Sequence, residues 1–247
     1  LREDLPEIIK SINKDLSIAI LFTNGWLLQH KVKELKQSGL DGVYISMDSA
    51  DEETHDKIRQ KPGLYKRALK GIEVAKKSGL SVGISCTIAE DDFRGGRLTE
   101  LIELGKELGI HEVLIFDMIP VGRAKGKKEL IDNRAWIDEM IDYTKKYNDQ
   151  DDYPGILVYA YGTSYKSTGC SGGTSYYYVS PYGDISPCDF NHAAFGNILE
   201  EPLHKIWDRL SSDSNFSQAS WRGCKMKDSK YLSKDESKSS SCADCSC

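Results

Sequence analysis

The sequence predicts an α/β protein in which helices surround a parallel sheet as a partial (β/α) barrel, followed by a small cysteine-rich domain of a β-hairpin and a helix. Three observations predict this class. Apolar strands alternate with amphipathic helices through the first half of the chain, six of the seven cysteines lie in the last third, and Cys170 and Cys188 bracket a hairpin pattern. Strands and helices that alternate at this spacing require parallel pairing with right-handed crossovers.

The predicted elements begin with a helix over residues 4–14, where apolar residues recur at helical spacing. Four apolar runs read as strands, and they cover residues 18–22, 43–48, 82–88 and 113–117. Amphipathic helices separate these runs. Three of the helices are predicted to stop at a glycine followed by an apolar residue, because glycine adopts the left-handed conformation at low cost; these glycines are Gly39, Gly79 and Gly109.

The strand over residues 82–88 favours a barrel over an open doubly wound sheet. One of its faces is apolar, and the other carries only small residues, which are Ser81, Gly83, Ser85 and Thr87. A small polar face suits a lumen that holds a ligand better than a filled core. The apolar face contains Cys86, which we therefore expect to be buried and inert.

Polar side chains follow the predicted strands at their carboxyl ends, where ligands gather in parallel α/β folds. Each of these residues alone is equally well explained as an ordinary turn or capping residue. Together they form the candidate site, which consists of Thr23, Asn24 and Gly25, of Ser46 and Asp48, of Ser85 and Thr87, and of Asp117.

The composition argues against a nucleic acid or membrane partner. The net charge is -5, and the longest basic run, residues 123–128, is short. No apolar run approaches the roughly 18 residues that span a bilayer, and the first residues lack the apolar core of a signal peptide. We therefore expect a cytoplasmic location.

The block from Cys170 to Cys188 contains two strands joined by a Pro-Tyr-Gly-Asp turn, a pattern that brings two thiols together. A helical run with Leu203, Ile206 and Leu210 comes next. Without an export signal, clustered cysteines favour metal or iron–sulfur ligation over disulfides, because a reducing cytosol keeps thiols free. A zinc-binding cap uses the same ligands and stays the alternative here.

Four segments, in the same order along the chain, resemble the radical S-adenosylmethionine (AdoMet) enzymes. Thr23-Asn-Gly25 is similar to the end of their third strand, and Ser46-x-Asp48 followed by His55-Asp-x-x-Arg59 is similar to their fourth-strand segment. Residues 116–123 resemble the Pro-x-Gly-Arg stretch after the sixth strand, and the cysteine block resembles the accessory iron–sulfur domain called SPASM or twitch. The resemblance covers nearly the whole chain.

The resemblance implies a binding site for AdoMet. Ser46 and Arg59 would hold the methionine end of AdoMet, since the planar fork of an arginine donates two parallel hydrogen bonds to a carboxylate. His55 would cap the helix or orient Arg59. Thr87 or Ser85 would reach the ribose, and the backbone near Val121 would flank the adenine. The implied cofactor-binding residues are Thr23, Asn24, Ser46, Asp48, Arg59, Ser85, Thr87 and Val121.

The resemblance also implies an auxiliary 4Fe-4S cluster, which takes four thiolates. Cys170 and Cys188 are its first candidate ligands because of the hairpin, and Cys224 comes next. The fourth ligand would come from Cys242, Cys245 or Cys247. Six thiols cannot complete two such clusters, so we expect one.

The sequence departs from the family in one respect. The Cys-x3-Cys-x2-Cys loop that binds the cleavage cluster is missing, as is a Gly-Gly-Glu-Pro segment, and residues 1–6 resemble the stretch directly after that segment. We therefore expect a truncated chain that lacks roughly two strands and one helix of the barrel. A second 4Fe-4S cluster would belong to the missing N-terminal segment.

These features predict a radical AdoMet enzyme that abstracts hydrogen with a 5'-deoxyadenosyl radical and matures a peptide or protein substrate, with an electron donor such as ferredoxin or flavodoxin. The alternatives are an enzyme that modifies tetrapyrroles and a non-catalytic, metal-stabilised peptide-binding scaffold. The predicted organisation is a partial barrel over residues 1–125, a bridging helix and strand over 126–165, and the auxiliary cluster domain over 166–247.

Overall fold

The structure is a computed structural model of the 247-residue chain, and it describes residues 2–131, 134–217 and 223–232. The chain divides into two compact units. The first unit contains residues 1–117 and 139–158, and the second contains residues 118–138 and 159–247.

A five-stranded parallel sheet forms the centre of the first unit. Its strands are β1 (Ile20–Thr23), β2 (Gly42–Ser46), β3 (Ser81–Ile88), β4 (Glu112–Asp117) and β5 (Gly155–Val158). They lie in the order β1-β2-β3-β4-β5, so each strand pairs in parallel with the one before it. This singly wound order is that of a (β/α) barrel, and within the described residues the barrel is not closed. The predicted α/β class and partial barrel are confirmed.

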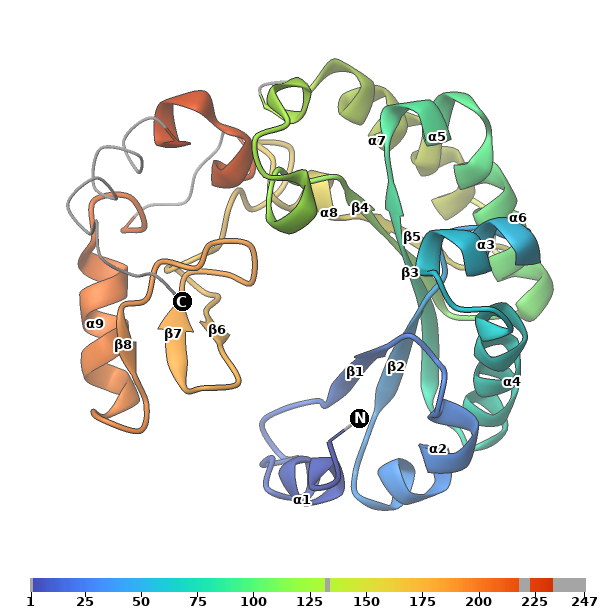
Figure 1. Ribbon diagram of the computed structural model, residues 1–247, viewed down its shortest axis with the longest axis horizontal. Helices are drawn as coiled ribbons and strands as arrows, with labels where there is room; N and C mark the ends of the chain where they lie inside the picture. The colour runs from blue at the N-terminus through green and yellow to red at the C-terminus, as the bar shows by residue number, and fades with distance from the viewer. Residues whose placement is uncertain (1, 132–133, 218–222, 233–247) are drawn as a thin grey trace. The chain divides into compact units, whose positions relative to one another are not determined.

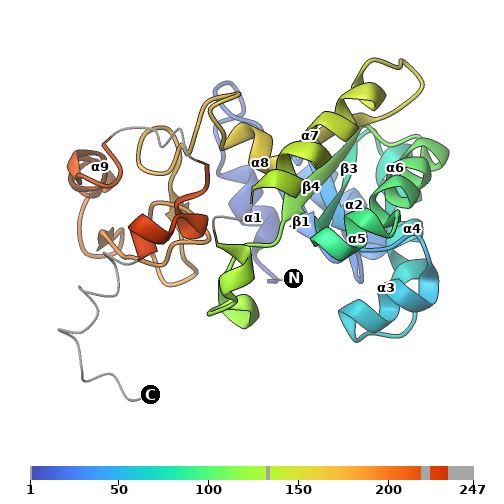
Figure 2. The same cartoon turned by 90° about the horizontal axis from the view of Figure 1, so that it is seen from above.

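Helices connect the strands, and α2, α4 and α6 lie on the same side of the sheet in both views (Figures 1 and 2). The helices of this unit are α1 (Leu5–Lys10), α2 (Leu28–Gln37), α3 (Glu52–Arg59), α4 (Leu64–Lys77), α5 (Glu90–Arg94) and α6 (Arg97–Leu108), together with most of α7 (Ala135–Asn148). The first helix is shorter than the predicted span 4–14, because it ends at Lys10 and the chain turns at Ser11. Helices α2 and α4 pack closely where Gly71 meets the side chain of Leu28.

Three helices end in the same local motif, as the sequence predicts. Gly39, Gly79 and Gly109 all have φ between 56° and 101°. The apolar residue after each glycine donates its amide to a carbonyl five residues earlier, as Leu40 does to Leu35 at 3.1 Å. Each of these bonds satisfies a helix carbonyl that has no partner within the helix, and the apolar residue is buried against the core.

The predicted apolar face of β3 is buried, and Cys86 on it is 2% exposed. The opposite face is only partly open. The ring of Tyr44 lies over Gly83, where any Cβ would collide with it, and stacks on Phe22 with ring centroids 4.8 Å apart. An aromatic layer therefore covers the sheet at the amino end of β3, and the small polar residues Ser85 and Thr87 lie beyond it, at the carboxyl end.

The second unit holds a small antiparallel sheet and the cysteine block. Its elements are the strands β6 (Tyr178–Val179), β7 (Asp184–Ser186) and β8 (Gly196–Asn197), the helices α8 (Tyr159–Gly162) and α9 (Leu203–Ser212), and the 3-10 turns η1 (Gly122–Ala124), η2 (Lys128–Leu130) and η3 (Lys225–Lys227). The hairpin between β6 and β7 and the following helix α9 are both as predicted. The core of this unit is a cluster of Ile185, Ile206, Leu210 and Phe216. None of the helices described in either unit has the length and apolar character to cross a bilayer.

Candidate functional site

An ion pair joins the ends of two elements of the first unit. Arg59, the last residue of α3, places its Nε 2.6 Å from Oδ2 of Asp48, which lies just after β2. Asp48 is 7% exposed, and its Oδ1 also accepts the amide of Thr87 at 3.4 Å. A buried carboxylate needs such partners, because removing its charge from water is costly. The pair therefore ties the carboxyl ends of β2 and β3 to α3.

His55 also binds Asp48, through the backbone. Its ring is fully buried, and Nδ1 accepts the amide of Asp48 at 3.2 Å. Burial lowers the pKa of His55, so the ring is neutral near pH 7 and carries its proton on Nε2. The cap of α3 is Asp51, which accepts the amide of Thr54 at 2.8 Å. His55 is therefore not the cap of α3, and its contact is with the backbone of Asp48, whose carboxylate pairs with Arg59.

Asp56 organises the loop after α3, a role that sequence reasoning missed. Its two carboxylate oxygens accept the amides of Gly63 at 2.5 Å and Tyr65 at 2.8 Å. Before these two residues the chain passes through Gln60, whose φ of 54° is the one positive value among the described residues other than glycine. The adjacent pair His55-Asp56 is the sequence feature that could have indicated this role, since both side chains accept hydrogen bonds from backbone amides.

A pocket of about 510 Å³ opens beside this loop. It brings together three predicted site residues, Thr23, Asn24 and Arg59. Its other lining residues were not predicted, and they are Trp26, Leu27, Gln60, Lys61 and Leu64. The cation of Lys61 lies 4.2 Å from the centre of the Trp26 ring, within cation–π range. One wall of the pocket is therefore basic and polar, which suits an anionic or zwitterionic ligand.

The other predicted strand-end residues lie along the same edge of the sheet. Ser46 is directly opposite Ser85 in the register of β2 and β3, and Thr87 is two residues further along β3. The side chain of Ser85 is buried, whereas that of Thr87 is exposed. Asp117 ends β4 and is 4% exposed. Val121 belongs to the second unit, where its amide donates to Ile119 at 2.8 Å.

Three reduced thiols lie near one another in the second unit. Burial raises the pKa of Tyr159, and negative charge on Cys224, Cys188 and Cys170 raises it further, so all three cysteines lie within electrostatic range of this phenol. Burial also raises the pKa of Cys188 to about 11, although hydrogen bonds from the backbone amides of Phe190 and Asn191 lower it. A metal must therefore displace a proton from this sulfur when it binds.

The loops that carry the thiols approach too closely for side chains. A Cβ on Gly172 would lie 3.0 Å from the carbonyl oxygen of Pro187, the residue before Cys188. A Cβ on Gly173 would collide with Phe216, in the core of the unit. Soft thiolates suit an iron–sulfur cluster or zinc, and the carboxylate of Asp189, next to Cys188, is the acidic group near them. Within the described ranges no ready-made group of three metal-binding side chains is present, and the predicted ligands Cys242, Cys245 and Cys247 lie outside those ranges.

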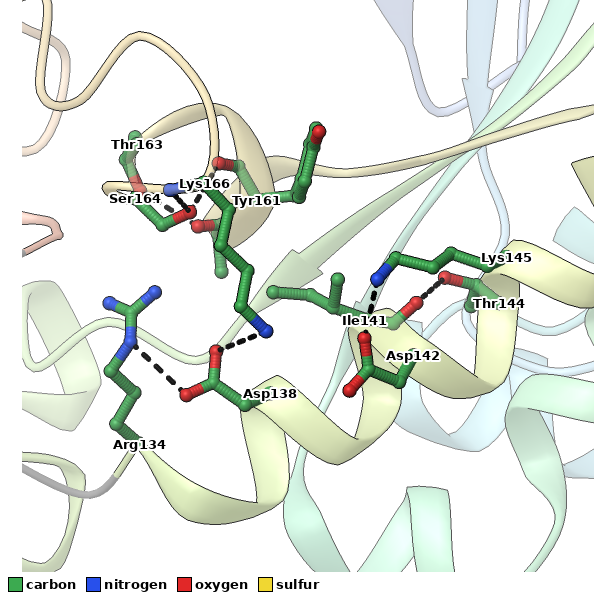
Figure 3. Close-up of polar contacts among 11 residues, drawn as sticks. Arg134, Asp138, Ile141, Asp142, Thr144, Lys145, Tyr161, Thr163, Ser164 and Lys166 are labelled. Atoms are coloured by element: carbon green, nitrogen blue, oxygen red, sulfur yellow. Dashed lines mark hydrogen bonds and ion pairs between the residues drawn. The ribbon is translucent and has the colours of Figure 1, made fainter.

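A charged network supports the third thiol. Asp138 lies 3.5 Å from Nε of Arg134 and 3.6 Å from Nζ of Lys166, through different carboxylate oxygens (Figure 3). Arg134 in turn fills the space beside Gly223, next to Cys224. Gly223 has a backbone φ of 102°, a conformation that residues with a side chain rarely adopt. This network therefore fixes the backbone from which Cys224 projects.

Comparison with known proteins decides the family. Residues 1–89 match the description Radical SAM superfamily, and residues 170–246 match the SPASM description, Iron-sulfur cluster-binding domain. The chain carries a radical SAM domain and a SPASM domain. The matches fall on the predicted barrel and on the predicted cysteine block, so the family resemblance noted in the sequence is confirmed.

Several curated radical SAM relatives carry the names of enzymes. AdoMet-dependent heme synthase of Methanosarcina barkeri is 32% identical over 210 residues, which is 76% of this chain and 60% of that protein. Fe-coproporphyrin III synthase of the same organism is 27% identical over 86% of this chain and 60% of that protein. GTP 3',8-cyclase of Aliarcobacter butzleri is 42% identical over 44% of this chain and 34% of that protein. The chain thus spans 60% of the length of the two Methanosarcina proteins.

Solved structures share the radical SAM fold at low identity. Streptococcus suis SuiB bound to S-adenosylmethionine aligns with a TM-score of 0.62 at 17% identity, over 83% of this chain and 51% of SuiB. Native anSMEcpe with bound AdoMet and Cp18Cys peptide aligns with a TM-score of 0.60 at 18% identity, over 87% of this chain and 63% of that protein. These likenesses establish the fold.

Proposed function

We propose that this chain belongs to a radical AdoMet enzyme. It binds AdoMet at the carboxyl ends of β1, β2 and β3, and it holds an auxiliary iron–sulfur cluster in the second unit. The observation that carries this proposal is the Asp48–Arg59 pair in the first unit, because Arg59 also lines the pocket with Thr23 and Asn24. Bound AdoMet, once reduced by one electron, supplies the 5'-deoxyadenosyl radical that abstracts a hydrogen atom from the substrate.

Arg59 is arranged to receive the carboxylate of AdoMet. Its inner nitrogen, Nε, faces Asp48, and its terminal nitrogens have no partner among the described residues. These two donors can take the two oxygens of a carboxylate side by side. The ion pair with Asp48 holds the guanidinium beside the site in advance, which lowers the entropy lost on binding. Ser46 and Ser85 offer hydroxyl groups on the same edge of the sheet.

The electron for cleavage would come from outside the described residues. Of the seven cysteines in the chain only Cys86 precedes residue 170, and it is buried with a strongly raised pKa caused by burial. A single protonated thiol does not fit a cluster that needs three cysteine ligands. We therefore assign no cleavage cluster to the described residues. A cluster on another segment, served by a ferredoxin or flavodoxin, would supply the electron.

The second unit fits the auxiliary cluster better. Cys170, Cys188 and Cys224 are all reduced thiols, and the loops of the first two pack together through Gly172. These residues would hold the cluster together with one of the later cysteines. The chemistry it would supply is acceptance of an electron from the product radical. Tyr159 and the apolar core of the unit would limit the access of water to it.

A tetrapyrrole is the substrate that the similarities favour. The relative named AdoMet-dependent heme synthase and that named Fe-coproporphyrin III synthase match this chain over 76% and 86% of its length. A peptide, which the sequence alone favours, is the second candidate. It is supported by the fold shared with SuiB bound to the precursor peptide SuiA, at 17% identity. Because sequence similarity is higher for the first group, we place the tetrapyrrole first.

The decisive experiment uses the complete protein, purified without oxygen, with AdoMet and dithionite. Iron tetrapyrroles with deuterated side chains are offered in one set of reactions, and deuterated peptides in another. Deuterium in the 5'-deoxyadenosine, measured by mass spectrometry, identifies the class whose hydrogen is abstracted. Transfer from peptides alone would reverse the order of the two candidates. Formation of no 5'-deoxyadenosine with any substrate would contradict the proposed activity.

A further inference from the structure

Lys225 is a buried cation in the second unit that neither the family match nor the cysteine pattern explains. It follows Cys224 directly and begins the turn η3. Its side chain is 9% exposed, whereas Lys230, five residues later, lies at the surface. The side chains of lysines almost always stay in water, since moving an ammonium into a protein costs several kcal/mol unless a counter-charge is present. The position of Lys225 therefore calls for a negative partner.

The immediate contacts of Lys225 do not provide that counter-charge. Its ammonium donates a hydrogen bond to the carbonyl oxygen of Asn215 and lies 4.6 Å from the ring centre of Phe216. Both contacts favour a cation, but both groups are neutral. Among the described residues no carboxylate lies within ion-pair distance of Nζ. Asp213 is near enough to act electrostatically but not to pair.

The packing connects this ammonium to the loops that carry two of the cluster thiols. Phe216, which Lys225 covers, lies against Gly173 in the loop that starts at Cys170. Gly172, in the same loop, lies against Pro187, which precedes Cys188. Burial lowers the pKa of Lys225, while negative charge on Cys170, on Asp213 and on Cys188 favours its protonated form. Of these groups, the two sulfurs are the ones that would belong to a bound cluster and share its negative charge.

We propose that the ammonium of Lys225 is the fixed counter-charge of the auxiliary cluster and raises its reduction potential. The inference rests on the auxiliary cluster proposed above. Reduction adds one negative charge to a cluster already bound by thiolates. A cation held in a poorly solvated site stabilises the reduced form more than the oxidised form, because its attraction grows with the charge of the cluster. Lys225 is thus a positioning and tuning residue with no contact to the substrate.

The test measures the potential of the auxiliary cluster in this 247-residue chain, reconstituted with iron and sulfide under nitrogen. Lys225→Met keeps the aliphatic stem and removes the charge, and Lys225→Arg keeps the charge. Lys230→Met is the matched control, since it removes the same charge from the surface of the same segment. The reduced cluster is followed by electron paramagnetic resonance during a redox titration, and iron and sulfide are counted for each variant.

We expect Lys225→Met to lower the ratio of reduced to oxidised cluster at a fixed applied potential about tenfold, which for one electron is a midpoint about 59 mV more negative. In Lys225→Arg and Lys230→Met the same ratio should stay within about threefold of the wild-type value. A threefold change is smaller than the tenfold change that one pKa unit represents. A wild-type midpoint in Lys225→Met with full iron would overturn the inference and leave the cluster assignment standing.

The remaining outcomes are also decisive. If Lys225→Met does not hold iron, Lys225→Gln replaces it, and a lowered midpoint there supports the inference. Loss of the cluster from both neutral variants would assign Lys225 to the stability of the unit and overturn the tuning role. A wild-type chain that takes up no iron and sulfide would overturn the auxiliary cluster and the inference together.

Discussion

The Nε atom of Arg59 lies 2.6 Å from Oδ2 of Asp48, and the amide of Asp48 in turn donates to His55, four residues before Arg59 on the same helix. Helix α3 thus contacts both the backbone and the carboxylate of Asp48. This ion pair holds the guanidinium close to the end of β2. It leaves the terminal nitrogens of one arginine on a short helix available to a ligand.

Arg59→Ala should weaken the binding of AdoMet about tenfold to a hundredfold, because a paired, charge-assisted contact contributes about 1.5 to 3 kcal/mol. Isothermal titration of the complete enzyme with AdoMet measures the dissociation constant. Lys57→Ala is the matched control, since Lys57 is an exposed cation on the same helix. Equal dissociation constants for Arg59→Ala and wild type would remove Arg59 from the binding site.

His55 should make the stability of the first unit sensitive to pH. Its pKa in the folded chain lies below the ordinary value of 6.5, chiefly because the ring is buried. The unfolded chain therefore binds a proton more readily, so the free energy of unfolding is highest above pH 6.5 and falls as the pH drops below it. Urea unfolding at several pH values between about 8 and about 5 measures this slope.

The variant His55→Leu separates this effect from the other four histidines. It should remove part of the slope and also cost about 1 to 3 kcal/mol near neutral pH, since the buried amide of Asp48 loses its acceptor. A His55→Leu variant with the same slope as the wild type would show that another group is responsible for the pH dependence.

Gln60→Gly should stabilise the first unit. A left-handed conformation costs a residue with a side chain about 1 to 2 kcal/mol, and the greater freedom of glycine in the unfolded chain offsets about 0.5 to 1 kcal/mol of the gain. We expect a net increase of about 0.5 to 1 kcal/mol in the free energy of unfolding, measured in urea. Gln37→Gly, at the end of α2, is the control and should destabilise. A loss of stability in Gln60→Gly would mean that its side chain makes a stabilising contact in the loop.

The 247-residue chain, purified anaerobically, should hold about four iron atoms per chain, bound through Cys170 and Cys188 with two later thiolates. Cys170→Ala and Cys188→Ala should each lose this iron and unfold the second unit at lower temperature, because its small core depends on the metal. Cys86→Ala should keep its iron, since that thiol is buried in β3. One zinc per chain without sulfide would favour the zinc-binding alternative.

The sequence predicts the sheet well because strand order and helix ends depend on local patterns. Alternation along residues 82–88 places Cys86 in the core, and the three glycine stops need only their own neighbours. Strand ends likewise predict Thr23 and Asn24 as part of a pocket. Nothing in these patterns indicates Trp26 and Lys61, because their meeting depends on the path of the loop after α3.

That loop path is set by Asp56, whose carboxylate binds two amides seven and nine residues further along the chain. No periodic pattern encodes such a contact. For the same reason the polar face of β3 is only partly the open lumen that alternation suggests. Tyr44 comes from the neighbouring strand and covers Gly83, and a single strand does not reveal what its neighbours place above it.

The strand order of the first unit also has a consequence for biosynthesis. Because β1 to β4 each pair with the strand that comes after them in the chain, every new strand and helix can dock on a surface that already exists when it leaves the ribosome. Local pairing of this kind allows the sheet to form in order from β1. The cysteines from Cys170 onward are made after all five strands of this sheet. Binding of the proposed cluster by the second unit can therefore follow synthesis of all five strands, so that its thiols need not remain reduced and unligated while the sheet forms.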